Sequence, residues 1–223
     1  MQTIKSTLIH TIVPVQRDLN PTKAGSPAII LLHGRGAHEE DLLGLQPYLD
    51  PNALLVVVRA PLSFPYGGYT WYETLHIGTP EPAQFAESYE RLVQFLEDVR
   101  KHYPVDPNRI ILLGFSMGAV MAYACALTKP EMIHSVVAHS GYIFEDTALA
   151  FRWKDLKGTG FFIAHGTEDP IIGVEFARRA RMLLSETDAE LVYKEYLIPH
   201  SMSEESVSDL SQWIRKRVDI ERM

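Results

Sequence analysis

Cysteine is almost absent from this chain of 223 residues: Cys125 is the only one, so no internal disulfide can form. That excludes the disulfide-stapled scaffolds of oxidising compartments, and we expect a cytoplasmic protein. Cys125 itself lies in an apolar helical stretch and is expected to be a small core residue. No apolar run approaches the ~20 residues needed to cross a bilayer, and no basic-then-apolar signal segment opens the chain, so stable membrane insertion is not expected.

Positive charge is also scarce, with 21 Lys and Arg against 28 Asp and Glu and a formal net charge of -7. A nucleic-acid partner would require a clustered basic surface, so none is expected. Metal-binding signatures are missing as well: His33 and His38 stand five apart in a glycine-rich loop, and no helix carries a His-Glu-x-x-His pattern. We therefore expect neither a metal nor a cofactor.

The most informative feature that is present is the pentapeptide from Gly114 to Gly118, which reads Gly-Phe-Ser-Met-Gly. An apolar run leads into it, and an apolar helical pattern follows it and ends before Pro130. Between a strand and a helix, such a sequence makes a sharp turn that projects the serine hydroxyl at the carboxyl end of the strand. The pattern predicts that Ser116 is a nucleophile. A plain strand-to-helix turn with a solvated serine is the alternative.

A nucleophilic serine needs a base to accept its proton, an acid to orient that base, and donors for the developing oxyanion. Downstream of Ser116, one predicted strand runs into an acidic turn that contains Glu168 and Asp169. A second predicted strand, at 190–198, is followed closely by His200. Acid and base candidates therefore come after two separate strands, and Glu168 competes with Asp169 for the role of the acid.

The chain alternates predicted strands and helices in the manner of a mostly parallel sheet with helices on both faces, which is an α/β fold. The inner strands are continuous apolar runs, as expected of strands that are covered on both sides. Nothing divides the chain, so residues 1–223 are predicted to form a single domain. We expect strands at 7–15, 28–32, 53–58, 110–113, 133–138, 160–164 and 190–198, a polar turn at 20–27, a helix after the pentapeptide, and helices at 39–49, 83–102, 174–184 and 204–218, the last opened by a capping box of Ser201 and Glu204.

Seven segments together resemble the carboxylesterase and acyl-protein thioesterase (lysophospholipase-like) family of α/β-hydrolases, over nearly the whole chain. They are 32–36 (Leu-His-Gly-Arg-Gly), 67–72 (Gly-Gly-Tyr-Thr-Trp-Tyr), 106–110 (Asp-Pro-Asn-Arg-Ile), 114–118, 139–141 (His-Ser-Gly), 165–170 and 199–200 (Pro-His). The resemblance implies an α/β-hydrolase fold, in which the catalytic residues follow in the order serine, carboxylate, histidine. It implies Ser116 as the nucleophile, Asp169 as the acid and His200 as the base.

By the same resemblance, the backbone N–H groups of Arg35 and Met117 would form the oxyanion hole. Two positions depart from the family pattern: Arg35 stands where relatives commonly have an apolar residue, and Ala119 where they often repeat glycine. A backbone donor tolerates both changes, so the role of the Arg35 side chain stays open. It is either a solvated residue at the rim or a contact to a polar or anionic part of the substrate.

Only about twenty residues separate the strand that ends near His139 from the next strand, so no substantial lid is expected. The loop at 60–84 is rich in aromatic residues and either walls an apolar groove beside the serine or simply packs onto the core. We name Trp71, Tyr72 and His139 as candidate pocket residues. His33 and His165 are expected to brace the oxyanion loop and the acid turn.

The sequence therefore predicts a serine hydrolase that cleaves carboxylic esters with short to medium acyl chains through an acyl-enzyme on Ser116. A lysophospholipase or acyl-protein thioesterase with the same chemistry is the first alternative. A non-catalytic binding protein that retains the fold is the second. The expected partner is a small-molecule ester, and a homodimer is compatible with the sequence.

Overall fold

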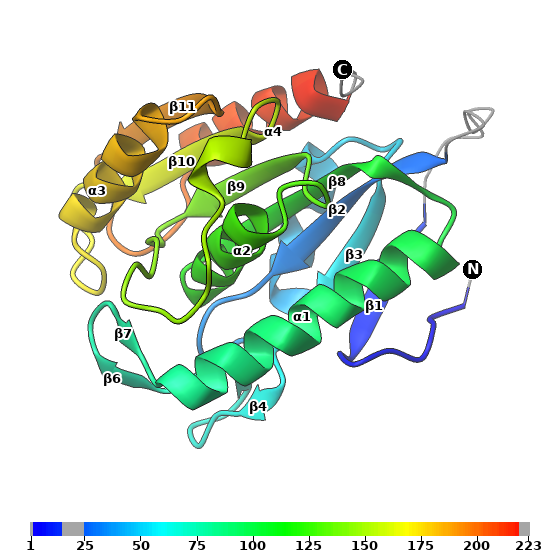
Figure 1. Cartoon of the computed structure of the whole chain (residues 1–223), viewed down its shortest axis with the longest axis horizontal. Helices are drawn as coiled ribbons and strands as arrows, with labels where there is room; N and C mark the ends of the chain where they lie inside the picture. The colour runs from blue at the N-terminus through cyan, green and yellow to red at the C-terminus, as the bar shows by residue number, and fades with distance from the viewer. Residues whose placement is uncertain (1, 15–24, 219–223) are drawn as a thin grey trace.

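The computed structural model describes residues 2–14 and 25–218, and its centre is a seven-stranded sheet (Figure 1). The strands run in the order β1-β3-β2-β8-β9-β10-β11, and every neighbouring pair is parallel except β1 with β3. This is the mostly parallel sheet that the alternating pattern predicts. The strands are β1 (His10–Val13), β2 (Ser26–Leu32), β3 (Leu54–Val58), β8 (Val105–Phe115), β9 (Ser135–His139), β10 (Gly160–Gly166) and β11 (Glu190–Tyr196).

Helices cover both faces of the sheet, and the two halves of the core show which helix lies on which face. Along β2, Ala28, Ile30 and Leu32 pack with α1, α2 and α3, whereas Ile29 and Leu31 pack with η1 and α4. Successive side chains of a strand point to opposite faces, so a strand covered on both sides must be apolar throughout. The helices are η1 (Glu39–Tyr48), α1 (Pro82–His102), α2 (Met117–Thr128), η2 (Trp153–Asp155), α3 (Val174–Ser185) and α4 (Glu204–Val218).

The connections at the carboxyl ends of the strands are loops and small hairpins. After β3 the chain forms two hairpins, β4 (Leu62–Ser63) with β5 (Tyr69–Thr70) and β6 (Thr74–His76) with β7 (Thr79–Pro80). Between β9 and β10, all of residues 140–159 are described, and η2 is the only regular element there. The predicted absence of a lid between these strands agrees with this short connection.

Several predicted boundaries differ from the structure. The strand at 7–15 is shorter and covers His10–Val13, and residues 20–24 of the predicted turn lie outside the described residues. The strand at 110–113 already begins at Val105. The helix at 39–49 is a 3-10 helix that contains Pro47, whose missing N–H cannot join an α-helical ladder.

The cap of α4 is also displaced from its predicted place. Ser203, not Ser201, accepts from the Ser206 N–H at 3.1 Å, and the Ser203 N–H donates to Ser206 Oγ at 3.0 Å. The two serines form a reciprocal pair of the kind seen in a capping box, two residues later than expected.

Among the described helices, none has both the length and the apolar composition to cross a membrane.

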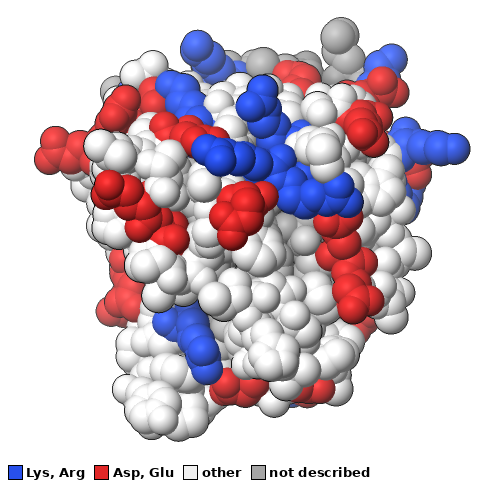
Figure 2. Space-filling view, turned by 90° about the vertical axis from the view of Figure 1, so that its left-hand side faces the viewer, with Lys and Arg blue, Asp and Glu red and all other residues white. Residues whose placement is uncertain are grey.

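Figure 2 shows the side of the molecule that carries α3 and the β6–β7 hairpin. Basic and acidic side chains are interspersed over its upper part. On α3 and its neighbours, Arg178 pairs with Glu195 at 2.8 Å and Arg179 with Glu145 at 2.7 Å. The lower part, toward the hairpin, is largely uncharged. Positive charge on this side therefore has negative charge next to it.

Candidate active site

Ser116 occupies a strained turn between β8 and α2. Its φ is 54° and its ψ is -121°, a region that L-residues rarely adopt. Close packing explains the flanking glycines: a Cβ on Gly114 would lie 2.3 Å from the Gly118 carbonyl oxygen, and a Cβ on Gly118 would lie 2.0 Å from the Leu32 carbonyl oxygen. The Ser116 N–H donates to the His139 carbonyl at 2.9 Å, which holds the turn against β9.

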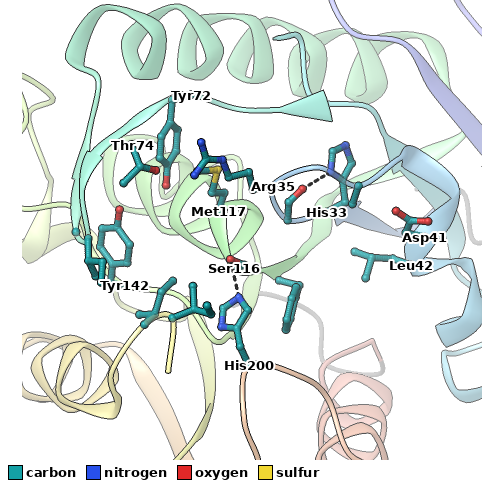
Figure 3. Close-up of a pocket in the computed structure, with 17 residues that line it drawn as sticks. His33, Arg35, Asp41, Leu42, Tyr72, Thr74, Ser116, Met117, Tyr142 and His200 are labelled. Atoms are coloured by element: carbon teal, nitrogen blue, oxygen red, sulfur yellow. Dashed lines mark hydrogen bonds between the residues drawn. The ribbon is translucent and has the colours of Figure 1, made fainter. Parts of the chain in front are cut away.

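Three residues far apart in the sequence meet at the carboxyl edge of the sheet. The Ser116 hydroxyl lies 3.0 Å from His200 Nε2 (Figure 3). His200 Nδ1 lies 2.7 Å from Asp169 Oδ2. With a neutral imidazole, the serine O–H donates to Nε2 and the Nδ1–H donates to the carboxylate. Since β8, β10 and β11 are parallel, the loops that follow them emerge at the same edge. The structure thus brings together Ser116, Asp169 and His200 as an ordered hydrogen-bonded chain.

Asp169 is held as a buried carboxylate. Its side chain has no solvent exposure, and Oδ1 accepts from the N–H groups of Ile171 and Ile172, both at 2.9 Å. Burial acts to raise the pKa of Asp169, but the donors Ile172, His200 and Ile171 outweigh it, and the pKa lies below its ordinary value. The competing acid, Glu168, is exposed. Geometry therefore favours Asp169 as the partner of His200.

Two further histidines lie behind this chain of hydrogen bonds. His165 is fully buried; its Nε2–H donates to the Ile172 carbonyl at 2.8 Å and lies 3.4 Å from Asp169 Oδ2. It thus braces the acid turn. His139 lies between the hydroxyls of Ser140 and Ser206, at 3.0 and 3.1 Å. Burial, reinforced by the neighbouring histidines, lowers the pKa of His139 to about 3, so the ring is neutral.

The loop that carries Arg35 is braced from below. His33 Nδ1–H donates to the Gly34 carbonyl at 2.7 Å, while Nε2 accepts from the Ala60 N–H at 3.0 Å. The Trp71 indole N–H donates to the His33 carbonyl at 2.9 Å. Burial lowers the pKa of His33, which keeps the ring neutral in this arrangement. His33 therefore braces the loop that carries Arg35.

Arg35 and Met117 both line the cavity beside Ser116. Met117 is the first residue of α2, so its N–H has no acceptor within the helix. The Met117 Sδ atom lies 3.3 Å from the Thr70 hydroxyl oxygen, so the methionine side chain packs against Thr70. Both residues therefore lie beside the serine, and the Met117 N–H is one of the helix-terminal donors without an intrahelical acceptor.

The Arg35 side chain has partners in the protein. Arg35 Nη2 pairs with Glu73 Oε2 at 2.9 Å, and its guanidinium lies 4.6 Å from the centre of the Phe64 ring. About two-fifths of each ion-pair side chain is exposed. A cation that is already paired and hydrated offers little charge to a substrate, so the structure favours the solvated rim role over substrate contact.

The cavity beside Ser116 has a volume of about 470 Å³ and mostly apolar walls. Of the three predicted pocket residues, Tyr72 lines it, but Trp71 and His139 do not. Both are fully buried behind the wall, Trp71 under the loop that carries Arg35 and His139 between β9 and α4. That part of the prediction is wrong, because a position next to the site does not decide which way a side chain points. The apolar lining is Ala37, Leu42, Tyr72, Ile77, Phe115, Met117, Tyr142, Ile171 and Ile172.

Sequence reasoning missed three lining residues that carried a usable signal. Tyr142 follows the carboxyl end of β9 and so belongs to the edge where sites of parallel sheets lie. Ile171 and Ile172 follow Asp169 by two and three residues. Among the described residues, no group of three or more His, Cys, Asp or Glu side chains could hold a metal ion.

Comparison with known proteins places this site in a family. The family model described as Phospholipase/Carboxylesterase matches residues 17–218. An acyl-protein thioesterase 1 from Debaryomyces hansenii is 28% identical, covering 91% of this chain and 96% of the relative. The crystal structure of the Bacillus cereus carboxylesterase has a TM-score of 0.83 at 24% identity and covers 94% of both chains. A carboxylesterase from Mesorhizobium loti also reaches a TM-score of 0.83, at 20% identity, covering 96% of this chain and 97% of its own.

The family model spans almost the whole described sheet, and the two carboxylesterase structures share its fold. These comparisons confirm the resemblance drawn from the seven sequence segments. The chain belongs to the phospholipase/carboxylesterase family of α/β-hydrolases and is a hydrolase of carboxylic esters.

Proposed function

We propose that the enzyme cleaves esters by transferring the acyl group to Ser116 and then to water. The observation that carries this proposal is the hydrogen-bonded chain from Ser116 through His200 to Asp169, with distances of 3.0 and 2.7 Å. Ser116 Oγ bonds to the acyl carbon while its proton passes to His200 Nε2. The imidazolium then gives that proton to the departing alkoxide or thiolate, and Asp169 stabilises its charge.

Deacylation repeats these steps with water in place of the serine. His200 takes a proton from the water as its oxygen attacks the acyl carbon, and the proton returns to Ser116 as the acyl group leaves. In both halves the carbonyl oxygen becomes an oxyanion. The backbone N–H groups of Arg35 and Met117 are the donors that we assign to it.

The cavity favours short to medium acyl chains. A volume of about 470 Å³ is typical of small-molecule sites and leaves little room for a long, branched lipid. Ile77 and Ile171 line this cavity and are also more than half exposed, so one side of its mouth is apolar and open. An acyl chain of moderate length would gain apolar burial there without a lid.

A thioester substrate is the second candidate, because relatives at 24 to 30% identity bear the name acyl-protein thioesterase 1. Cleavage of a thioester uses the same serine, base and oxyanion donors with a better leaving group. An oxygen ester and a thioester of the same acyl chain would separate the two candidates. Both form the same acyl-enzyme and share its deacylation rate, so a difference in kcat/KM reports the preference for one leaving group.

We further propose a cytoplasmic location, and a homodimer is compatible with the sequence.

The test is covalent capture of the serine together with a series of 4-nitrophenyl esters. A fluorophosphonate should label the native protein on Ser116, as peptide mass spectrometry would locate it, and should not label Ser116→Ala. The same variant should lose nearly all ester hydrolysis while it keeps the native melting temperature, because the change removes one small group. Labelling at another residue, or turnover retained by Ser116→Ala, would refute the assignment.

A further inference from the structure

One corner of the cavity differs from its apolar walls because three hydroxyl groups gather there. Tyr72, Thr74 and Tyr142 all line the cavity, and Figure 3 shows their hydroxyls turned toward the same space beside Ser116. They come from two separate segments, Tyr72 and Thr74 from the hairpin region after β5 and Tyr142 from the loop after β9. We call these three residues the hydroxyl corner.

The Tyr72 hydroxyl is the unusual member of the hydroxyl corner. It is fully buried, and within residues 2–14 and 25–218 it has no hydrogen-bond partner. The Tyr142 hydroxyl lies beside it and interacts with it, but without the geometry of a hydrogen bond. A buried hydroxyl without a partner lowers stability, and in enzymes such costs are retained where a ligand supplies the missing partner.

Both tyrosine rings are held in place. Tyr72 packs edge-on against Phe85, with the ring centres 5.5 Å apart, and Tyr142 packs against Phe176 at 5.3 Å. The Thr70 hydroxyl donates to the Tyr72 carbonyl at 2.8 Å and fixes the backbone. The two phenols are therefore preorganised, so the protein loses little side-chain entropy when a ligand binds to them.

The surroundings decide what kind of group could bind. Burial raises the pKa of Tyr72 and of Tyr142, so both hydroxyls stay protonated at neutral pH and can donate. The arginine that lines the cavity, Arg35, is already paired with Glu73. An ionised carboxylate would thus lose its hydration without gaining a free cation, whereas a neutral oxygen loses much less.

We propose that the hydroxyl corner recognises a neutral acceptor oxygen, such as a ketone or ester carbonyl, in the substrate a few atoms from the scissile bond. Tyr142 donates to that oxygen, and its hydroxyl, once turned toward the ligand, accepts from the buried Tyr72 hydroxyl. The natural substrates would then be oxo-substituted esters rather than plain alkanoates. This inference rests on the proposed ester hydrolysis at Ser116.

The test compares 4-nitrophenyl hexanoate with 4-nitrophenyl 4-oxohexanoate and 5-oxohexanoate. Each oxo ester differs from the plain ester by one additional carbonyl group in the acyl chain. For each enzyme variant, kcat/KM of the oxo ester is divided by that of the plain ester. We expect this ratio to fall about fivefold in Tyr72→Phe and in Tyr142→Phe, which corresponds to the loss of one neutral hydrogen bond. Intrinsic differences in ester reactivity cancel, because each ester reacts in every variant.

Tyr66→Phe is the matched control, because Tyr66 is 90% exposed and does not line the cavity. It should leave the ratio unchanged. Tyr72→Phe should also keep or raise the melting temperature, since it removes a hydroxyl without a partner. This second measurement separates a recognition effect from a loss of folding.

A second pair places the carbonyl in the alcohol: 3-oxobutyl butanoate against butyl butanoate. A ratio that falls in both phenylalanine variants in either pair supports the proposal and tells which side of the ester lies at the hydroxyl corner. Ratios that stay within twofold of wild type in both pairs overturn it. Hydrolysis of plain hexanoate that depends on Ser116 would, in that case, leave the proposed function standing.

Discussion

The buried ring of His139 should make the protein less stable in mild acid. Its pKa is lowered to about 3 in the fold, whereas an unfolded histidine has a pKa of about 6.5. Between these values the unfolded chain binds a proton that the folded protein excludes. The contribution to stability is therefore fully present above pH 6.5 and is lost as the pH falls toward 3.

The size of this effect follows from the two pKa values. Between pH 7 and pH 4.5, linkage through His139 alone should remove about 2.5 kcal/mol from the free energy of unfolding. His10, His33 and His165, whose pKa values are also lowered by burial, add to the slope in the same direction. A single variant must therefore be compared with wild type at both pH values.

Replacement of His139 by Gln removes the titrating group and keeps a side chain that can bond to Ser140 or Ser206. Urea unfolding followed by tryptophan fluorescence at pH 7 and 4.5 gives the free energy of unfolding at each pH. Wild type should lose about 2.5 kcal/mol more than His139→Gln between the two. The exposed His76→Gln should behave like wild type. Equal losses in wild type and His139→Gln would refute the reasoning.

Three further changes test the site. Asp169→Asn should lower kcat by a factor on the order of 10⁴, because the amide no longer holds the His200 tautomer, while the exposed Glu168→Gln stays near wild type; the reverse pattern would identify Glu168 as the acid. Arg35→Leu should change kcat/KM for matched neutral and anionic esters equally, within about twofold, since its charge is paired; a tenfold selective loss on the anionic ester would show substrate contact. Gly118→Ala should destabilise the fold by more than about 3 kcal/mol, because its Cβ would lie 2.0 Å from the Leu32 carbonyl oxygen, and a native urea midpoint would contradict that clash.

The local sequence determined the helices and strands, and it also determined which strand each candidate catalytic residue follows. The apolar runs predicted the inner strands because both faces of those strands are covered, and the pentapeptide predicted the turn at Ser116 because only glycines fit its close approaches. Since parallel strands end at one edge, the positions of Asp169 and His200 after two strands were enough to bring them to Ser116.

Only the tertiary structure decided which neighbouring side chains face the cavity. Trp71 and Tyr72 are adjacent and equally buried, yet Trp71 bonds to the His33 carbonyl while Tyr72 turns to the hydroxyl corner. Arg35 pairs with Glu73, which lies 38 residues away in the sequence, so its charge already has a partner. These side chains belong to irregular loops, where no periodicity of the sequence fixes the direction of a side chain. They depend on contacts between distant segments, which exist only once the sheet has brought the loops together.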